Sequence, residues 1–133
     1  MSSILFVCIH NACRSQIAEA ICRSLAPRAW TIASAGTNPS TQVDRKATDI
    51  LQRHQLAMHA TTPKGFAEVP AIQWDCVVDI TDGDHHYSVL ARERIRWGIP
   101  DPLDGPMALY EELFQELSGR VRMLIREMSS CPP

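Results

Sequence analysis

Two side chains near the start of the sequence have the types and the spacing needed to bind and attack an oxyanion. Cys8 and Arg14 are separated by a short run of mostly small or polar residues. A cysteine thiolate is a strong nucleophile, and a planar guanidinium can hold two oxygens of a phosphate-like group at once. The pair therefore predicts chemistry on a tetrahedral oxyanion, with Cys8 as the nucleophile and Arg14 as the clamp.

The sequence around this pair is typical of a strand, a loop and a helix. Residues 4–7 form an apolar run that favours a strand, and apolar residues recur at helical spacing from Ile17 to Leu25. A loop that leads into a helix directs free backbone N–H groups at one point, where the helix dipole adds positive potential. We expect these groups to hold Cys8 as a thiolate and to bind the anion. The expected phosphate-binding residues are Ile9, His10, Asn11, Ala12, Cys13, Arg14 and Ser15.

A carboxylic acid is expected at the same site, although it lies far along the chain. Asp101 stands between Pro100 and Pro102, after a short strand expected at 95–97. Ligands of parallel sheets bind at the carboxyl ends of the strands, so Asp101 can meet Cys8 there and exchange protons with a leaving group and with water. The local sequence alone is more typical of a turn. The acid–base role of Asp101 therefore depends on a wider resemblance.

Four stretches, in the right order, resemble the low-molecular-weight protein tyrosine phosphatase superfamily, which includes arsenate reductases coupled to thioredoxin or to small thiols. These stretches are residues 7–20, 34–37, 62–64 and 97–102. The resemblance implies a single-domain, three-layer α/β/α fold with a central four-stranded parallel sheet. It also implies that Cys8, Arg14 and Asp101 are the nucleophile, the oxyanion clamp and the acid–base group.

The resemblance leaves three functions open. The first is a cysteine-dependent phosphatase that hydrolyses phosphate monoesters, of phosphotyrosine type, through a cysteinyl-phosphate intermediate. The second is an arsenate reductase in which Cys8 is the nucleophile and an external thiol is the reductant. The third is a non-catalytic module that senses phosphate or another oxyanion, although binding alone needs neither Cys8 nor Asp101.

Two departures from the family pattern bear on this choice. Thioredoxin-coupled reductases carry a resolving pair of cysteines after the third strand, and residues 79–87 contain no cysteine. Phosphotyrosine-specific members often carry tyrosines just beyond the Asp-Pro pair, and residues 103–106 contain none. The internal relay of disulfides and a preference for phosphotyrosine proteins are therefore both in question.

The sequence allows two interpretations of the role of Cys13. It is either a loop residue without a chemical role, or a redox partner that forms a reversible disulfide with Cys8 and shields it from over-oxidation. Tyr87 is expected to contribute to a wall of the substrate site.

Composition limits the number of domains and the classes of partner that we expect. With 133 residues, of which 45% are hydrophobic and 21% charged, the chain is expected to form one domain over residues 1–133, with a flexible tail at 129–133. The net charge of −2 gives no reason to expect nucleic acid or an anionic membrane as a partner. The five cysteines favour reduced thiols. No leader or anchor is expected, so the default location is cytoplasmic, and neither a metal nor a cofactor is predicted.

The expected partners follow from this chemistry. They are a phosphorylated small molecule or phosphoprotein, or arsenate, with phosphate- or sulfate-like anions in the loop and a thiol reductant if the chain is a reductase.

Hydrophobic periodicity predicts alternating strands and helices, joined by right-handed crossovers. Strands are expected at 4–8, 30–35, 74–80 and 95–97, and helices at 15–25, 43–54 and 106–128, with Ser15 as the cap of the first helix. A short strand or extended segment is expected at 56–58, a helical turn before Pro70, and a loop followed by a short helix within 81–94.

Overall fold

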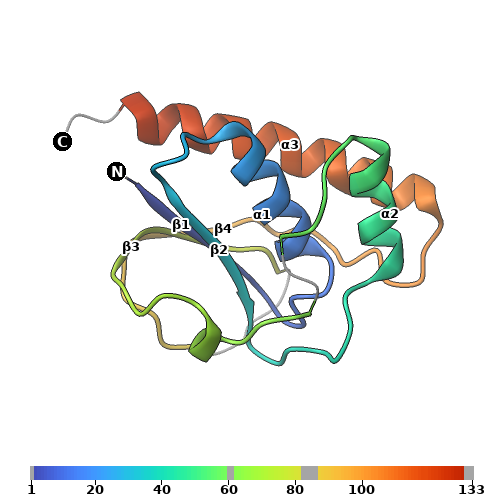
Figure 1. The fold of residues 1–133 in the computed structure, drawn as a ribbon, viewed down its shortest axis with the longest axis horizontal. Coiled ribbons are helices and arrows are strands. Elements are labelled where there is room, and N and C mark those ends of the chain that lie inside the picture. Colours follow the sequence, from blue (N-terminus) through green and yellow to red (C-terminus); the bar gives the residue numbers. More distant parts are fainter. Residues whose placement is uncertain (1, 60–61, 82–86, 131–133) are drawn as a thin grey trace.

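A computed structural model describes residues 2–59, 62–81 and 87–130 of the chain (Figure 1). In chain order the elements are β1 (Ser3–Cys8), α1 (Arg14–Leu25), β2 (Thr31–Gly36), α2 (Arg45–Arg53), the 3₁₀ turn η1 (Phe66–Glu68), β3 (Trp74–Asp79), β4 (Ala91–Arg96) and α3 (Met107–Ser130). The strands form one four-stranded sheet in the order β2-β1-β3-β4, and every pair is parallel. The predicted α/β class with a four-stranded parallel sheet is confirmed.

β1 is a central strand, and its end determines where the site lies. All six of its residues are buried, as expected for a strand covered on both faces. Its last residue, Cys8, pairs with Gly36 at the end of β2, while Val7 pairs with Asp79 at the end of β3. Cys8 therefore lies at the carboxyl edge of the sheet, between the ends of its neighbours.

The two faces of the sheet are covered differently. Side chains of α1, α2 and α3 share one apolar cluster with Ile4, Phe6 and Val78 of the sheet, so these helices lie on one face (Figure 1). The opposite face is covered by Phe66 of η1 and by loop residues such as Val69. Of the helical elements in the described chain, only the short η1 lies there, so the expected outer helical layer is thin. Pro63 and Pro70 interrupt this connection and disfavour a longer helix.

Several predicted boundaries are wrong. α1 begins at Arg14 after Cys13, so Ser15 lies inside the helix and is not its cap. α2 begins at Arg45, where the Asp44 carboxylate accepts a hydrogen bond from the Lys46 N–H at 2.9 Å. β2 begins one residue later than expected, at Thr31.

The region from residue 54 onward also departs from expectation in part. Residues 56–58 form no strand, whereas the helical turn before Pro70 is present as η1. The described residues of 81–94 form no helix, because β4 already begins at Ala91, and residues 82–86 lie outside the described chain. α3 extends to Ser130, two residues into the expected tail, of which 131–133 are not described.

Among the described residues, no helix combines the length and apolar character needed to cross a membrane.

Candidate active site

The loop between β1 and α1 is held from outside by the segment that follows β2. Backbone N–H groups of this segment donate to loop carbonyls over distances between 2.8 and 3.1 Å, with the pairs Thr37 to Cys8, Asn38 to Ile9, Ser40 to His10 and Asp44 to Ala12. In a trans peptide the C=O of one residue and the N–H of the following residue point in opposite directions. Because these carbonyls bond outward, the N–H of the residue after each of them faces the inside of the loop. The loop is therefore a preformed nest of N–H groups suited to an anion.

Gly36 allows the loop to approach β2 this closely. A Cβ atom at this position would lie 2.6 Å from the carbonyl oxygen of Ile9 and 2.9 Å from the backbone nitrogen of Asn11. Both are backbone atoms, so moving them aside would cost considerable free energy. The stretch 34–37, which resembles the family, thus contributes the space that the loop needs.

The sulfur of Cys8 accepts two hydrogen bonds. The Asn11 backbone N–H lies 3.3 Å from it and the Ser15 hydroxyl oxygen lies 2.8 Å from it. Because the Asn11 side-chain amide already donates to the Ser15 oxygen at 2.8 Å, the hydroxyl proton of Ser15 is free to point at the sulfur. Two donors directed at one sulfur stabilise a thiolate.

Asn11 joins the loop to three neighbouring segments. It is fully buried and has a φ of 52°, a conformation that asparagine tolerates better than most residues. Its amide nitrogen donates to Ser15 and to Ser34 at 2.9 Å, and its amide oxygen accepts from the Gln16 side chain at 3.0 Å and the Lys64 backbone N–H at 2.7 Å. The sequence did not predict this network.

A buried carboxylate lies behind Asn11. Glu19 accepts a hydrogen bond from Ser34 at 2.5 Å and lies 3.4 Å from the ammonium of Lys64 and 2.9 Å from Nε of Arg23. Two cations thus compensate a carboxylate that is wholly removed from water. Sequence reasoning missed this group, although Ser34 and Lys64 both lie in stretches that resemble the family.

Arg14 and Asp101 face each other at the mouth of the loop. The Arg14 side chain is 5% exposed; its Nη1 donates to the carbonyl of Ile99 at 2.8 Å, and its Nη2 lies 3.9 Å from Asp101 Oδ2. The other Asp101 oxygen accepts from the Leu103 N–H at 3.1 Å. The loop after β4 therefore orients the guanidinium and presents the carboxyl group beside it.

These groups meet in one cavity of about 440 Å³, which we name the reaction pocket. It is lined by Cys8, His10, Ala12, Cys13, Arg14, Ser40, Gln42, Val43, Asp44, Asp101, Leu103 and Asp104. The structure thus brings Cys8, Arg14 and Asp101 together. Of the other predicted loop residues, Asn11 and Ser15 lie behind the sulfur and Ile9 does not line the pocket.

Tyr87 does not line the reaction pocket. Its ring stacks on Phe66 with centroids 5.4 Å apart, and its hydroxyl donates to Asp79 at 3.2 Å. The expectation that it forms a wall of the substrate site is wrong for this pocket, because Tyr87 packs on the thinly covered face of the sheet.

Cys13 lines the reaction pocket but is only 6% exposed. Burial raises the pKa of its thiol well above the ordinary value, and the nearby carboxylates of Asp44 and Asp101 raise it further. Cys8 and Cys13 are both free thiols here. Since only a thiolate attacks sulfur rapidly, Cys13 is a poor resolving thiol in this conformation.

Asp44 connects the pocket wall to α3, a contact that the sequence did not predict. The hydroxyl of Tyr110, a buried residue of α3, donates to the Asp44 carboxylate, while the Asp44 backbone N–H donates to the Ala12 carbonyl at 2.9 Å. The long helix thereby supports the loop from behind.

Comparisons of the sequence and of the structure with known proteins both find similar proteins. Residues 3–131 match the family model described as low molecular weight phosphotyrosine protein phosphatase. Low molecular weight phosphotyrosine protein phosphatase 2 of Drosophila melanogaster is 43% identical over 79 residues, which are 50% of this chain and 48% of that protein. The match thus spans about half the length of that relative.

Arsenate reductases are also similar, over more of the chain. Arsenate reductase 2 of Staphylococcus saprophyticus is 25% identical over 123 residues, covering 90% of this chain and 93% of that protein. The crystal structure of arsenate reductase from Archaeoglobus fulgidus has a TM-score of 0.79 at 28% identity and covers 92% of this chain and 98% of that one. Because the family model covers nearly the whole sequence and the loop, clamp and carboxyl group meet in one pocket, the chain belongs to the low molecular weight phosphotyrosine protein phosphatase family.

Proposed function

We propose that this chain is a cysteine-dependent phosphatase that hydrolyses phosphate monoesters of phosphotyrosine type. One observation carries the proposal: the Cys8 sulfur accepts hydrogen bonds from Asn11 and Ser15 inside a nest of N–H groups that opens into the same pocket as Arg14 and Asp101. Family membership supports it. A module that only sensed oxyanions would need neither a thiolate nor an acid, so the sensor alternative is not favoured.

In the first step, the phosphoryl oxygens of the ester bind the loop N–H groups and Arg14, and the Cys8 thiolate attacks phosphorus opposite the leaving oxygen. The S–P bond forms while the P–O bond breaks. Protonated Asp101 gives its proton to the leaving oxygen. The products of this step are an alcohol or phenol and a cysteinyl phosphate.

In the second step, water attacks phosphorus and Asp101, now a carboxylate, accepts a proton from it. The new O–P bond forms while the S–P bond breaks, which releases phosphate and restores the Cys8 thiolate. Acid–base assistance of this kind is worth roughly 10²- to 10⁴-fold in rate. The 3.9 Å separation of Arg14 Nη2 and Asp101 Oδ2 supports the proposal that clamp and acid act on the same substrate.

Arsenate reduction with an external thiol is the second candidate, and the similarity to arsenate reductases over most of the chain favours it. The Cys8 thiolate would attack arsenate, forming an S–As bond as an As–O bond breaks and releases water. A thiol would then attack the Cys8 sulfur, forming an S–S bond as the S–As bond breaks. The two sulfurs are oxidised to a disulfide as arsenic(V) is reduced to arsenic(III) and leaves as arsenite. The raised pKa of Cys13 favours an external thiol such as glutathione or mycothiol, with glutaredoxin-type help, for this attack.

Parallel assays on one preparation distinguish the candidates. We expect p-nitrophenyl phosphate to be hydrolysed, Cys8→Ser to abolish turnover, and Cys22→Ala, which removes a buried thiol outside the pocket, to retain it. Arsenate reduction is measured with thioredoxin, with glutaredoxin and with small thiols alone. Efficient thioredoxin-dependent reduction that survives Cys13→Ser, together with negligible ester hydrolysis, would contradict the proposal.

Both reactions need Cys8 as a free thiol. We therefore infer that the protein works in a reducing compartment, for which the cytoplasm is the ordinary case.

A further inference from the structure

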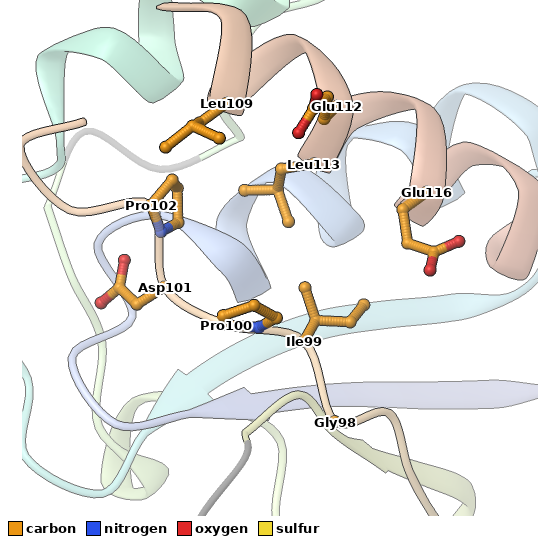
Figure 2. Close-up of a pocket in the computed structure, with 9 residues that line it drawn as sticks. All are labelled: Gly98, Ile99, Pro100, Asp101, Pro102, Leu109, Glu112, Leu113 and Glu116. Carbon is orange, nitrogen blue, oxygen red and sulfur yellow. The ribbon is translucent and has the colours of Figure 1, made fainter. Parts of the chain in front are cut away.

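A second cavity adjoins the reaction pocket on the other side of the Asp101 loop. It measures about 250 Å³ and lies between residues 98–102 and the first turns of α3 (Figure 2). We name it the α3 groove; it is lined by Gly98, Ile99, Pro100, Asp101, Pro102, Leu109, Glu112, Leu113 and Glu116. Asp101 lines both cavities, so the two cavities adjoin at this residue.

The floor of the groove is apolar. Ile99 and Leu113 are each 5% exposed and close its base, whereas Leu109 remains 43% exposed at its edge. In Figure 2 the side chains of Leu109 and Leu113 extend from α3 toward the proline-flanked loop. A partly exposed leucine over a closed apolar base favours the burial of one aliphatic side chain from a ligand.

The rim of the groove is acidic. Glu112 and Glu116 are exposed on α3, and the set of lining residues, all of them described, contains no lysine, arginine or histidine. Glu116 pairs with the half-buried Arg120 at 3.5 Å, one turn further along α3. An aliphatic floor beside two exposed carboxylates is complementary to a ligand that carries both an aliphatic group and a positive charge.

The backbone of residues 100–102 separates the two cavities. The Asp101 carboxyl group points away from Leu109 and Leu113, toward the reaction-pocket side of the loop (Figure 2). A ligand that fills both cavities must therefore pass over this backbone. A peptide, which extends about 3.3–3.6 Å per residue, can do this while its phosphorylated side chain enters the reaction pocket.

We propose that the α3 groove binds the segment of a phosphoprotein substrate that neighbours the phosphorylated residue, with an aliphatic side chain on the floor and a lysine or arginine at the rim. This inference rests on the proposed phosphatase function and names its substrate class. The groove then contributes to substrate selection, while Cys8, Arg14 and Asp101 act on the phosphoryl group.

The test compares kcat/KM for three phosphotyrosine peptides that differ only in the flanking pair: leucine with arginine, leucine with glutamate, and two glycines. We expect the leucine–arginine peptide to exceed the leucine–glutamate peptide by about tenfold, because two rim carboxylates attract one charge and repel the other. Added salt should reduce this ratio. The double variant Glu112→Gln, Glu116→Gln should abolish it, and Leu109→Ala should lower kcat/KM for both leucine peptides.

Controls lie on the same helix. Glu127→Gln and Met123→Ala change an exposed carboxylate and an exposed aliphatic side chain of α3 that do not line the groove. They should leave all three peptides unchanged. Hydrolysis of p-nitrophenyl phosphate, which cannot reach the groove, should be the same in every groove and control variant.

Two failures are distinguishable. Normal hydrolysis of p-nitrophenyl phosphate with equal kcat/KM for the three peptides would overturn the groove assignment and leave the phosphatase standing. Absence of hydrolysis would overturn the proposed phosphatase function. The groove assignment would then be tested by measuring the affinity of the wild-type chain for the same peptides. Equal affinities would overturn it, as would a dimer that Leu109→Ala dissociates, because a second copy would then be the occupant.

Discussion

At the scale of single residues, the state of Cys8 depends on Asn11. The Asn11 backbone N–H reaches the sulfur directly, and its side chain orients the Ser15 hydroxyl that reaches the sulfur from the other direction. Because both hydrogen bonds to the Cys8 sulfur depend on Asn11, a substitution at Asn11 should strongly affect the nucleophile. The linear spacing of Cys8 and Arg14 was visible in the sequence, whereas this support was not, because its partners Ser34 and Lys64 come from distant segments.

Asn11→Ala should impair both stability and catalysis. The change leaves buried partners without their hydrogen bonds, so we expect the free energy of unfolding to fall by about 2–4 kcal/mol. Misplacement of the sulfur and the hydroxyl should lower kcat on the order of 10²-fold. Urea unfolding and p-nitrophenyl phosphate kinetics measure the two effects.

Two further variants separate the causes. Asn11→Gly accepts the positive φ without strain and should still lose activity, since the lost amide is responsible. Asn38→Ala keeps the backbone groups that Asn38 contributes to the loop and should behave like the wild type. Full activity in Asn11→Gly would show that the side-chain network is dispensable.

Arg14→Lys tests the geometry of the clamp, because charge is retained. An ammonium cannot hold two phosphoryl oxygens and the Ile99 carbonyl with the same planar fork, so kcat/KM should fall roughly 10²- to 10³-fold, as for the loss of a transition-state donor. Inhibition by inorganic phosphate should weaken in parallel. The exposed Arg53 on α2 provides the control, and equal effects of Arg53→Lys would contradict the assignment.

Asp101→Asn should slow hydrolysis according to the leaving group. Alkyl phosphates, whose leaving oxygen needs a proton most, should lose about 10²- to 10⁴-fold in kcat, and activated aryl phosphates much less. Equal losses for both substrates would mean that the carboxyl group mainly orients the loop through Leu103 and Arg14.

At the scale of elements, the loop and β2 form one unit. The carbonyls of the loop bind N–H groups from residues 37–44, and Gly36 provides the clearance between them. The anion nest is therefore a property of two crossing segments, not of the Cys-to-Arg stretch alone.

Gly36→Ala should damage this unit. A methyl group would contact backbone atoms of Ile9 and Asn11 at 2.6 and 2.9 Å, and we expect overpacking to cost about 1–3 kcal/mol in the free energy of unfolding, with weaker binding of phosphate. Gly119 on α3 is the matched control, because nothing lies within 4 Å of its added Cβ. Gly119→Ala should raise stability by about 0.5–1 kcal/mol through helix propensity.

The elements were predictable where hydrophobic pattern alone determines them. The strands at Ser3–Cys8 and Trp74–Asp79 and the long amphipathic helix at Met107–Ser130 follow from apolar runs and 3–4 spacing. β4 was misjudged because its residues are mostly charged: it is an edge strand, exposed over much of its length. Ser15 was misjudged only as the cap of the first helix, because α1 begins one residue earlier, at Arg14.

At the scale of the whole molecule, buried thiols make stability depend on alkaline pH. Burial raises the pKa of Cys22 and of Cys76 to about 12, against about 8.5 in an unfolded chain. Above pH 8.5 the unfolded chain loses protons that the folded chain retains, so the folded state is favoured less as pH rises toward 12. Each thiol should lower the free energy of unfolding by up to about 1.4 kcal/mol per pH unit in this window.

Urea unfolding at pH 8, 9 and 10 measures this loss. Cys22→Ala should be less stable at pH 8 because of the lost packing, but its stability should decline less steeply with pH. The same slope in wild type, Cys22→Ala and Cys76→Ala would show that other groups, such as the buried Tyr110 with its raised pKa, control alkaline unfolding.

The central position of β1 also has a consequence for biosynthesis. Ser3 in β1 bonds to Asp75 in β3, 72 residues further on, so β1 is translated well before one of the two strands that flank it. At about 5–20 residues per second, a ribosome takes roughly 4–14 s to add that length of chain. During this interval the apolar strand that ends in Cys8 has a partner on only one side. Nascent chains of this protein are therefore expected to need protection from aggregation until β3 has emerged.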